Sequence, residues 1–248
     1  MAKYNIEDLY SVFNKIDGEF GETKVNGSLS EFANESIKKY CPKRNGLQIR
    51  TCVSYLQMAN SGVINLLEML KDKNGLEYDK LAEYAILFLS YKLKQHSQYS
   101  GTNLNYFYTR YIEKNDDYNK KINGDGSPTY KEIINKNKDL MNTNEISKFN
   151  GPFSILCILY NEIKNNKVDC TKCPNYPENF ANKFEELNND SNINGNTSYS
   201  KLLSTLSDDY NNLKNKYDNN NSCNFHLFQR QYLRKKLKKV KKKLKLNI

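Results

Sequence analysis

The chain has 248 residues, with 38 Lys or Arg against 28 Asp or Glu and a formal net charge of +10 at pH 7. This length suits one large domain or two of ordinary size, and it is sufficient to bury a sizeable apolar core. No stretch approaches the run of about 20 apolar residues that crosses a bilayer, and the N-terminus shows no apolar signal segment. We therefore expect a chain that is soluble or held peripherally at a membrane.

The net charge is confined to the C-terminal end. Residues 222–248 carry ten basic side chains and no acidic one, which leaves 28 basic and 28 acidic residues in 1–221. The ten are Arg230, Arg234, Lys235, Lys236, Lys238, Lys239, Lys241, Lys242, Lys243 and Lys245. Because unpaired ammonium groups cannot be buried, we expect a neutral globular body over 1–221 and a separate cationic tail over 222–248.

Apolar residues recur at helical spacing along nearly the whole body, and no run alternates strictly as a strand would. The pattern predicts an all-α, irregular multi-helix globular domain of roughly eight or nine helices, followed by a basic C-terminal helix or tail. In order, the expected helices cover residues 6–16, 29–40, 47–71, 79–95, 104–112, 128–141, 146–164, 180–187 and 198–217, with a polar loop at 188–196.

Local signals mark some of the expected boundaries. Ser28, with Glu31 three residues later, resembles a capping box at the start of the second helix. Gly62 would break or bend the third helix, and Gly151, followed by a proline, would break the seventh. The segment 79–95 is apolar on almost every side over its middle, so we expect it at the centre of the fold.

Six cysteines are candidates for disulfide bonds. They are Cys41, Cys52, Cys157, Cys170, Cys173 and Cys223. An even number favours an oxidised, extracytoplasmic domain, whereas reduced cysteines that merely fill space are the alternative. Cys41 and Cys52 flank a loop that contains Pro42 and Gly46, which makes them the most plausible local pair.

No arrangement of residues indicates catalysis or a cofactor. Cys170 and Cys173 form a lone C-x-x-C, whereas zinc needs about four ligands and a thioredoxin-like site needs a βαβ context. Of the two histidines, His226 lies in the tail and His96 is expected at a solvated helix end. No Gly-rich phosphate loop is present. We therefore expect no enzyme, no metal, no cofactor and no small-molecule substrate.

The tail has internal order. Leu233, Leu237, Val240 and Leu244 are spaced as one stripe of a helix, with cations on the other faces. A basic amphipathic helix suits an anionic membrane surface, a calmodulin-like groove or a phosphate backbone, and a solvated tail that binds nothing is the alternative. The neutral body offers no second basic face, so we expect no specific nucleic acid.

Several segments together resemble a known family. They are Tyr40-Cys-Pro, the apolar segment 81–93, Leu104-Asn-Tyr-Phe-Tyr-Thr-Arg-Tyr-Ile, Lys138-Asp-Leu-Met, Glu145-Ile-Ser-Lys-Phe and Leu202-Leu-Ser-Thr-Leu-Ser-Asp-Asp-Tyr. In this order they resemble the Plasmodium interspersed repeat (PIR) proteins of rodent malaria parasites. The resemblance implies a non-enzymatic, multigene variant surface antigen, exported toward the infected red-cell surface. Its helical domain would meet a host receptor or antibody and serve immune evasion.

The resemblance also implies an order of segments from which the chain departs. In the family a stalk and a transmembrane helix normally separate the helical domain from a basic cytoplasmic tail. Here Ser222-Cys-Asn-Phe-His runs directly into a tail of the cytoplasmic kind that starts at Leu227. A splice form, a deletion or a gene-model error would each produce this junction. The alternative function is therefore a soluble intracellular adaptor, or a protein that binds anionic membranes or nucleic acid through the tail.

Overall fold

The computed structural model describes residues 4–43, 49–73, 75–164, 167–172, 174–217, 223 and 225. Its helices and strands are α1 (Ile6–Asp17), β1 (Phe20–Val25), β2 (Ser28–Ala33), α2 (Glu35–Lys38), α3 (Tyr55–Leu70), α4 (Tyr78–Gln95), α5 (Leu104–Phe107), α6 (Tyr130–Lys136), α7 (Thr143–Ser147), α8 (Asn150–Asn161), β3 (Ile163–Lys164), β4 (Lys167–Val168), α9 (Tyr176–Asn189), α10 (Ser191–Gly195) and α11 (Thr197–Tyr217). A π-helical segment (Tyr108–Ile112) and 3-10 helices (Asp116–Asn119, Lys138–Met141, Cys170–Lys172) connect some of them. The expected all-helical class is confirmed, with two small two-stranded sheets added.

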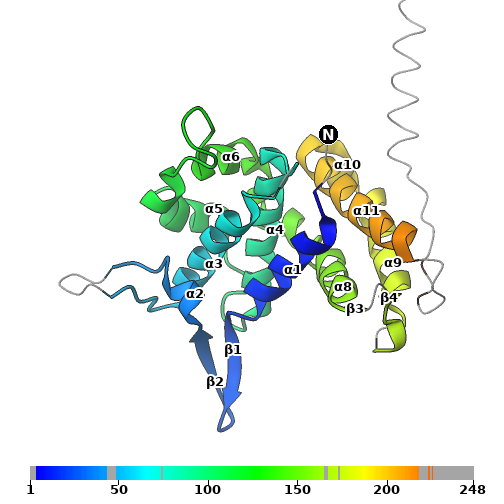
Figure 1. Ribbon diagram of the computed structural model, residues 1–248, viewed down its shortest axis with the longest axis horizontal. Helices are drawn as coiled ribbons and strands as arrows, with labels where there is room; N and C mark the ends of the chain where they lie inside the picture. Colours follow the sequence, from blue (N-terminus) through cyan, green and yellow to red (C-terminus); the bar gives the residue numbers. More distant parts are fainter. Residues whose placement is uncertain are drawn as a thin grey trace, which may run out of the picture.

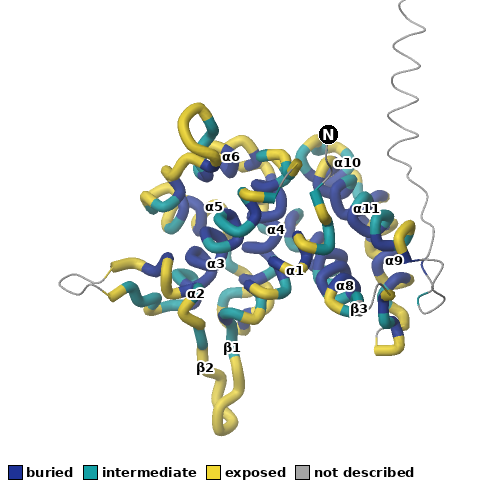
Figure 2. Tube along the Cα trace, in the orientation of Figure 1, coloured by how far each residue is buried: buried dark blue, intermediate teal, exposed yellow. Residues whose placement is uncertain are grey.

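Helix α4 is the centre of the fold. It contacts α3, α6, α7 and α8, and Figure 1 shows α3, α6 and α8 around it. Its residues from Leu81 to Ser90 are all buried, and the dark interior of Figure 2 surrounds it. The expectation drawn from its all-round apolar pattern is therefore confirmed.

Side-chain caps define several helix starts. The Asn5 side chain accepts a hydrogen bond from the Glu7 amide at the start of α1. Thr129 and Glu132 form a reciprocal capping box at the start of α6. Each cap satisfies amide groups that the first helical turn would otherwise leave without partners.

The helix expected over 29–40 is wrong for its first part, because residues 29–33 belong to strand β2 of a β-hairpin and only the short α2 (Glu35–Lys38) is helical. Strands β1 and β2 pair antiparallel from Phe20 opposite Ala33 to Val25 opposite Ser28. Asn26 and Gly27 join them with φ of 51° and 82°, which is the backbone of a type I′ turn. An Asn-Gly pair between two short extended segments is the strongest local signal for a hairpin. It outweighs the helical spacing of the apolar residues in 29–40.

Two expected interruptions of helices are also displaced. Helix α3 continues through Gly62, and the Phe20 ring packs where a side chain at this position would stand. Helix α8 begins at Asn150, so Gly151 and Pro152 lie in its first turn, where proline is tolerated. The third helix starts only at Tyr55, after a disulfide-linked loop, rather than near residue 47.

Helices α8 to α11 form the other side of the body (Figure 1). Helix α11 packs against α8, α9 and α10, and the expected polar loop at 188–196 contains the short helix α10. Cys223 is bonded to Cys170, and Phe225 packs edge-on against Tyr210. The globular body therefore includes residues 223 and 225, beyond the boundary expected at residue 221.

Candidate interaction surface

The β1–β2 hairpin projects from the helical body, as Figures 1 and 2 show. At its base, Phe20 is 1% exposed, whereas Val25 and Leu29 near the turn are 51% and 55% exposed. The hairpin is thus anchored at one end and open to contact at the other.

His96 holds the two strands at the base of this hairpin. Its Nε2 lies 3.1 Å from Glu31 of β2 and 3.4 Å from Glu22 of β1. The amide of Gln98 donates to Nδ1 over 3.1 Å, which assigns the proton of the neutral ring to Nε2. The expected solvated helix end is therefore wrong: His96 is 2% exposed, because the hairpin covers it.

Glu22 also receives two hydrogen bonds from the residue after His96. The Ser97 amide and hydroxyl donate to its two carboxylate oxygens over 2.6 and 2.7 Å. The amide bond is the main reason that the pKa of Glu22 lies below its usual range, and the nearby His96 contributes. The residues that follow α4 thus hold strand β1 through the Glu22 carboxylate.

Lys92 forms a second anchor beneath the hairpin. Its ammonium donates to Asp17 Oδ1 over 2.7 Å and to the carbonyls of Asp17 and Phe20 over 3.0 Å each. Burial lowers the pKa of Lys92, and the adjacent Asp17 carboxylate opposes that shift. One buried cation therefore joins the end of α1 to the start of β1.

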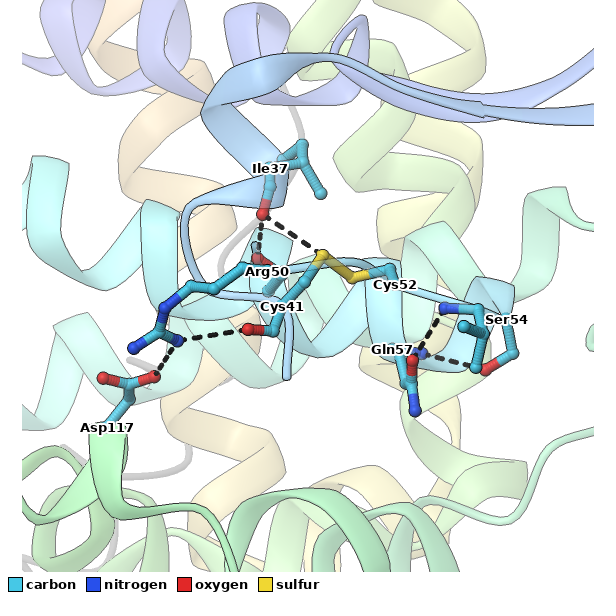
Figure 3. The surroundings of a disulfide bond; sticks show 9 residues. Ile37, Cys41, Arg50, Cys52, Ser54, Gln57 and Asp117 are labelled. Atoms are coloured by element: carbon cyan, nitrogen blue, oxygen red, sulfur yellow. Dashed lines mark hydrogen bonds and ion pairs between the residues drawn. A yellow bond between two sulfur atoms is a disulfide. The ribbon is translucent and has the colours of Figure 1, made fainter. Parts of the chain in front are cut away.

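A disulfide bond, drawn in Figure 3, joins Cys41 and Cys52 at the two ends of residues 41–52, which are called the disulfide loop below. It joins the two cysteines that the sequence favoured as a local pair. Arg50 donates to the Cys41 carbonyl over 3.1 Å and lies 3.6 Å from Asp117, so it ties the loop to the segment beyond α5. Gln57 accepts from the Val53 amide over 2.8 Å at the start of α3.

A cleft of about 450 Å³ lies beside the disulfide loop and is called the basic cleft below. It is lined by Tyr40, Cys41, Pro42, Lys43, Arg50, Gln57, Asn60, Arg110, Tyr111, Lys114, Asn115, Asp116 and Asp117. The sequence analysis did not find this cluster, because its residues come from three separate segments that only the fold brings together.

The remaining cysteines divide into a second disulfide and a buried thiol. Cys170 pairs with Cys223, so it is not bonded to Cys173, which lies outside the described residues. The expectation that Cys157 belongs to a disulfide is wrong: it is a free thiol inside α8 and is 5% exposed. Burial raises the pKa of this thiol well above its ordinary value.

Asp209 is a fully buried carboxyl group of the helical core. Its Oδ2 accepts from Tyr84 over 2.8 Å and from Tyr10 over 2.9 Å, while Oδ1 has no hydrogen-bond partner among the described residues. Burial raises the pKa of Asp209 to about 7. Asp209 is 0% exposed and does not line the basic cleft. Together with Tyr10 and Tyr84 it forms an interior cluster that joins α1, α4 and α11.

The predicted tail contacts from Arg230 to Lys245, and His226, lie outside the described residues. Within the part that the structure describes, no group of three or more His, Cys, Asp or Glu side chains is placed to hold a metal ion.

A sequence model described as "Plasmodium variant antigen protein Cir/Yir/Bir" matches residues 10–246, nearly the whole chain. The chain belongs to this family. The relationship to PIR proteins expected from the quoted segments is thereby confirmed.

The fold agrees with the Cir/Yir/Bir assignment. A solved structure, described as a Plasmodium PIR protein ectodomain, is 31% identical with a TM-score of 0.65, over 91% of this chain and 99% of that one. Among curated proteins no sequence matches the chain. In this Cir/Yir/Bir protein, none of the helices in the described ranges has both the length and the apolar character needed to span a bilayer.

Proposed function

We propose that the helical body acts as the host-facing part of a variant surface antigen that is exported to the infected red cell. The supporting observation is that 91% of the chain superposes on a PIR ectodomain with 31% identity. On this proposal the protein has no catalytic activity and works through its surface, by contact with a host receptor or antibody and by immune evasion.

The layout of the exposed segments supports this role. The hairpin extends from the buried core and is anchored by His96, and a disulfide bond joins Cys41 and Cys52 at the two ends of the disulfide loop. Exposed segments on a rigid scaffold can change sequence with little effect on the core. Such an arrangement suits a surface that must vary while the fold persists.

Antibodies against the full chain test the location. They should stain intact, unpermeabilised infected red cells, and trypsin treatment of those cells should remove the signal. An antibody against a parasite protein that stays inside the cell serves as the control. Staining that requires permeabilisation would contradict surface display.

A fluorescent tetramer of the full chain tests the host contact. It should bind a subset of host cells, and antibodies that recognise the hairpin or the disulfide loop should block it. If the folded chain binds no host cell type, the proposed host contact is wrong.

A second function, contact with an anionic membrane surface, is favoured by the ten cations of the tail. Near an anionic leaflet each cation contributes about 1 kcal/mol. The full chain should therefore bind phosphatidylserine vesicles, and added salt should weaken the binding. A chain ending after Phe225 keeps the Cys170–Cys223 bond and should lose this affinity. Equal binding by the shortened chain would exclude the tail account.

A further inference from the structure

The basic cleft is concave and carries a surplus of positive charge. Four basic and two acidic side chains line its 450 Å³. Asp117 is already engaged, at 3.6 Å from Arg50 and 2.8 Å from Lys120. In the described part of the chain, Lys43, Arg110 and Lys114 have no ion-pair partner, and all three are exposed.

The uncharged polar groups of the cleft also offer donors rather than acceptors. Asn60 is only 4% exposed, and its Oδ1 accepts from the buried Tyr118 hydroxyl over 3.1 Å. Gln57 uses its Oε1 on the Val53 amide. The amide NH₂ groups of Asn60 and Gln57 therefore have no acceptor among the described residues. Both amides line the cleft, so a ligand can bring an acceptor for these donors.

Three large apolar side chains that neighbour cleft residues in the sequence are exposed. Ile49 and Val53, in and next to the disulfide loop, are 64% and 62% exposed, and Tyr106, one helical turn before Arg110, is 57% exposed. Exposed apolar side chains around Arg and Tyr are typical of the centres of protein–protein interfaces. The combination suits a partner that brings an acidic group together with apolar neighbours.

We propose that the basic cleft binds an acidic segment of a partner protein, with a Glu or Asp carboxylate seated between Arg110, Lys114 and the amides of Asn60 and Gln57. Arginine recognises carboxylates through paired N–H bonds, which gives direction as well as charge. A small concave site with a surplus of two cations matches one or two carboxylates, whereas an extended polyanion requires a long basic stripe. The inference rests on the proposed host contact and gives it a location and a chemistry.

The test uses the full chain with its ten tail cations changed to Gln, so that the tail cannot hold an acidic probe. The probe is a fluorescein-labelled peptide of alternating Glu and Leu, and its binding is measured by anisotropy at low salt. Arg110→Glu with Lys114→Glu should weaken binding about tenfold or more. The matched control, Lys15→Glu with Lys201→Glu, reverses two exposed lysines of α1 and α11 and should leave binding unchanged.

Two further probes decide the chemistry. A Gln-for-Glu version of the peptide should bind at least tenfold more weakly, and a heparin hexasaccharide should not compete with the acidic peptide. The proposal would be overturned if the Glu and Gln peptides bound equally well, or if the control variant lost as much binding as the Arg110 and Lys114 variant. Displacement of the acidic peptide by heparin would also overturn it. Should the charge reversal lower the melting temperature, Arg110→Gln with Lys114→Gln replaces it, with the same expected direction.

Host-cell staining separates this inference from the proposed function. If the chain with the neutral tail stains host cells and the Arg110→Glu, Lys114→Glu version stains them equally, the cleft proposal is wrong and the host contact stands. If the starting chain stains no host cell while it still binds the acidic peptide in the cleft, the host contact is wrong and the cleft chemistry stands.

Discussion

Glu22 and Glu31 face each other as direct register partners across the β1–β2 hairpin. Two like charges at such positions destabilise a hairpin. Here the His96 ring lies between the hairpin and the core and contacts both carboxylates, and Ser97 donates to Glu22. The hairpin therefore depends on the end of α4 for its stability, and it cannot form with the same strength alone.

Replacing Glu22 with Gln should loosen this base. Ser97 would lose its charged acceptor, and we expect hairpin amides to exchange roughly tenfold faster in hydrogen-exchange mass spectrometry. Because the folded pKa of Glu22 is lowered, its contribution is present above the unfolded pKa and is lost as the pH falls through the folded value. The wild-type hairpin should thus lose protection in strongly acidic solution more steeply than the variant.

The control for this experiment is Glu35→Gln. Glu35 is 87% exposed and pairs only with its helical neighbour Lys38 among the described residues. If the hairpin amides exchanged faster in the control, or at an unchanged rate in Glu22→Gln, the contacts of Glu22 with Ser97 and His96 would not stabilise the hairpin.

Asp209→Asn should change how stability depends on pH. The folded pKa of Asp209 is raised to about 7, so its protonated form favours the fold, and this contribution is lost as the pH rises through 7. From pH 5 to 8 the wild type should lose about 2–3 kcal/mol of unfolding free energy through this group. The variant should lack that decline, as measured by urea unfolding at both pH values.

Asp125→Asn, in an exposed loop, is the matched control and should keep the wild-type pH profile. An Asp209→Asn protein whose stability falls just as steeply between the two pH values would refute the assignment.

Gly62→Ala should destabilise the body despite the helix preference for alanine. A Cβ at this position would stand 2.6 and 2.9 Å from two atoms of the Phe20 ring. Overpacking of this kind lowers the free energy of unfolding by about 1–3 kcal/mol. The loss should be measured as a lower midpoint of thermal unfolding. Adding Phe20→Leu should recover part of the loss, whereas Gly101→Ala, with open space around it, should have little effect. A stabilised Gly62→Ala protein would contradict the packing.

Lys92→Met should be among the most damaging single changes. It leaves the Asp17 carboxylate and the Phe20 carbonyl without their buried donor, and removal of one partner of such a pair costs about 3 kcal/mol or more. Lys94→Met changes an exposed lysine of the same helix and serves as the comparison in chemical unfolding. Equal stability of the two variants would show that the Lys92 anchor carries little energy.

Cys157 should resist alkylation in the native protein. Its thiol is buried with a raised pKa, and only the exposed thiolate reacts readily. Peptide mapping after iodoacetamide treatment should show Cys157 unmodified without denaturant and modified in it, with no reducing agent in either sample. Native labelling would mean that α8 opens far more often than its burial indicates.

How far the sequence could predict the molecule depended on the range of the interactions. The apolar periodicity of 79–95 identified the central helix, because a helix buried all round must be apolar all round. The same periodicity misled over 29–40, where the local turn at Asn26 and Gly27 decides the structure. The Cys41–Cys52 bond could be predicted from the sequence because its cysteines are 11 residues apart. Cys170 and Cys223 are 53 residues apart, and their pairing could not be predicted.

The residues of the candidate surface were much harder to predict from the sequence. His96 looks solvated when only its neighbours in the chain are considered, and only the hairpin, more than 60 residues earlier, buries it. The basic cleft likewise combines Lys43, Asn60 and Arg110, whose spacing in the chain has no period to detect.

By itself the sequence determined the helical class through its local spacing, and it confined the net charge to residues 222–248. The family was identified from the resemblance of the quoted segments. Only the tertiary structure decided which polar side chains are buried together and which remain open to a partner. The physical reason is that burial and hydrogen-bond satisfaction are properties of contacts between distant segments, and those contacts exist only once the chain has folded.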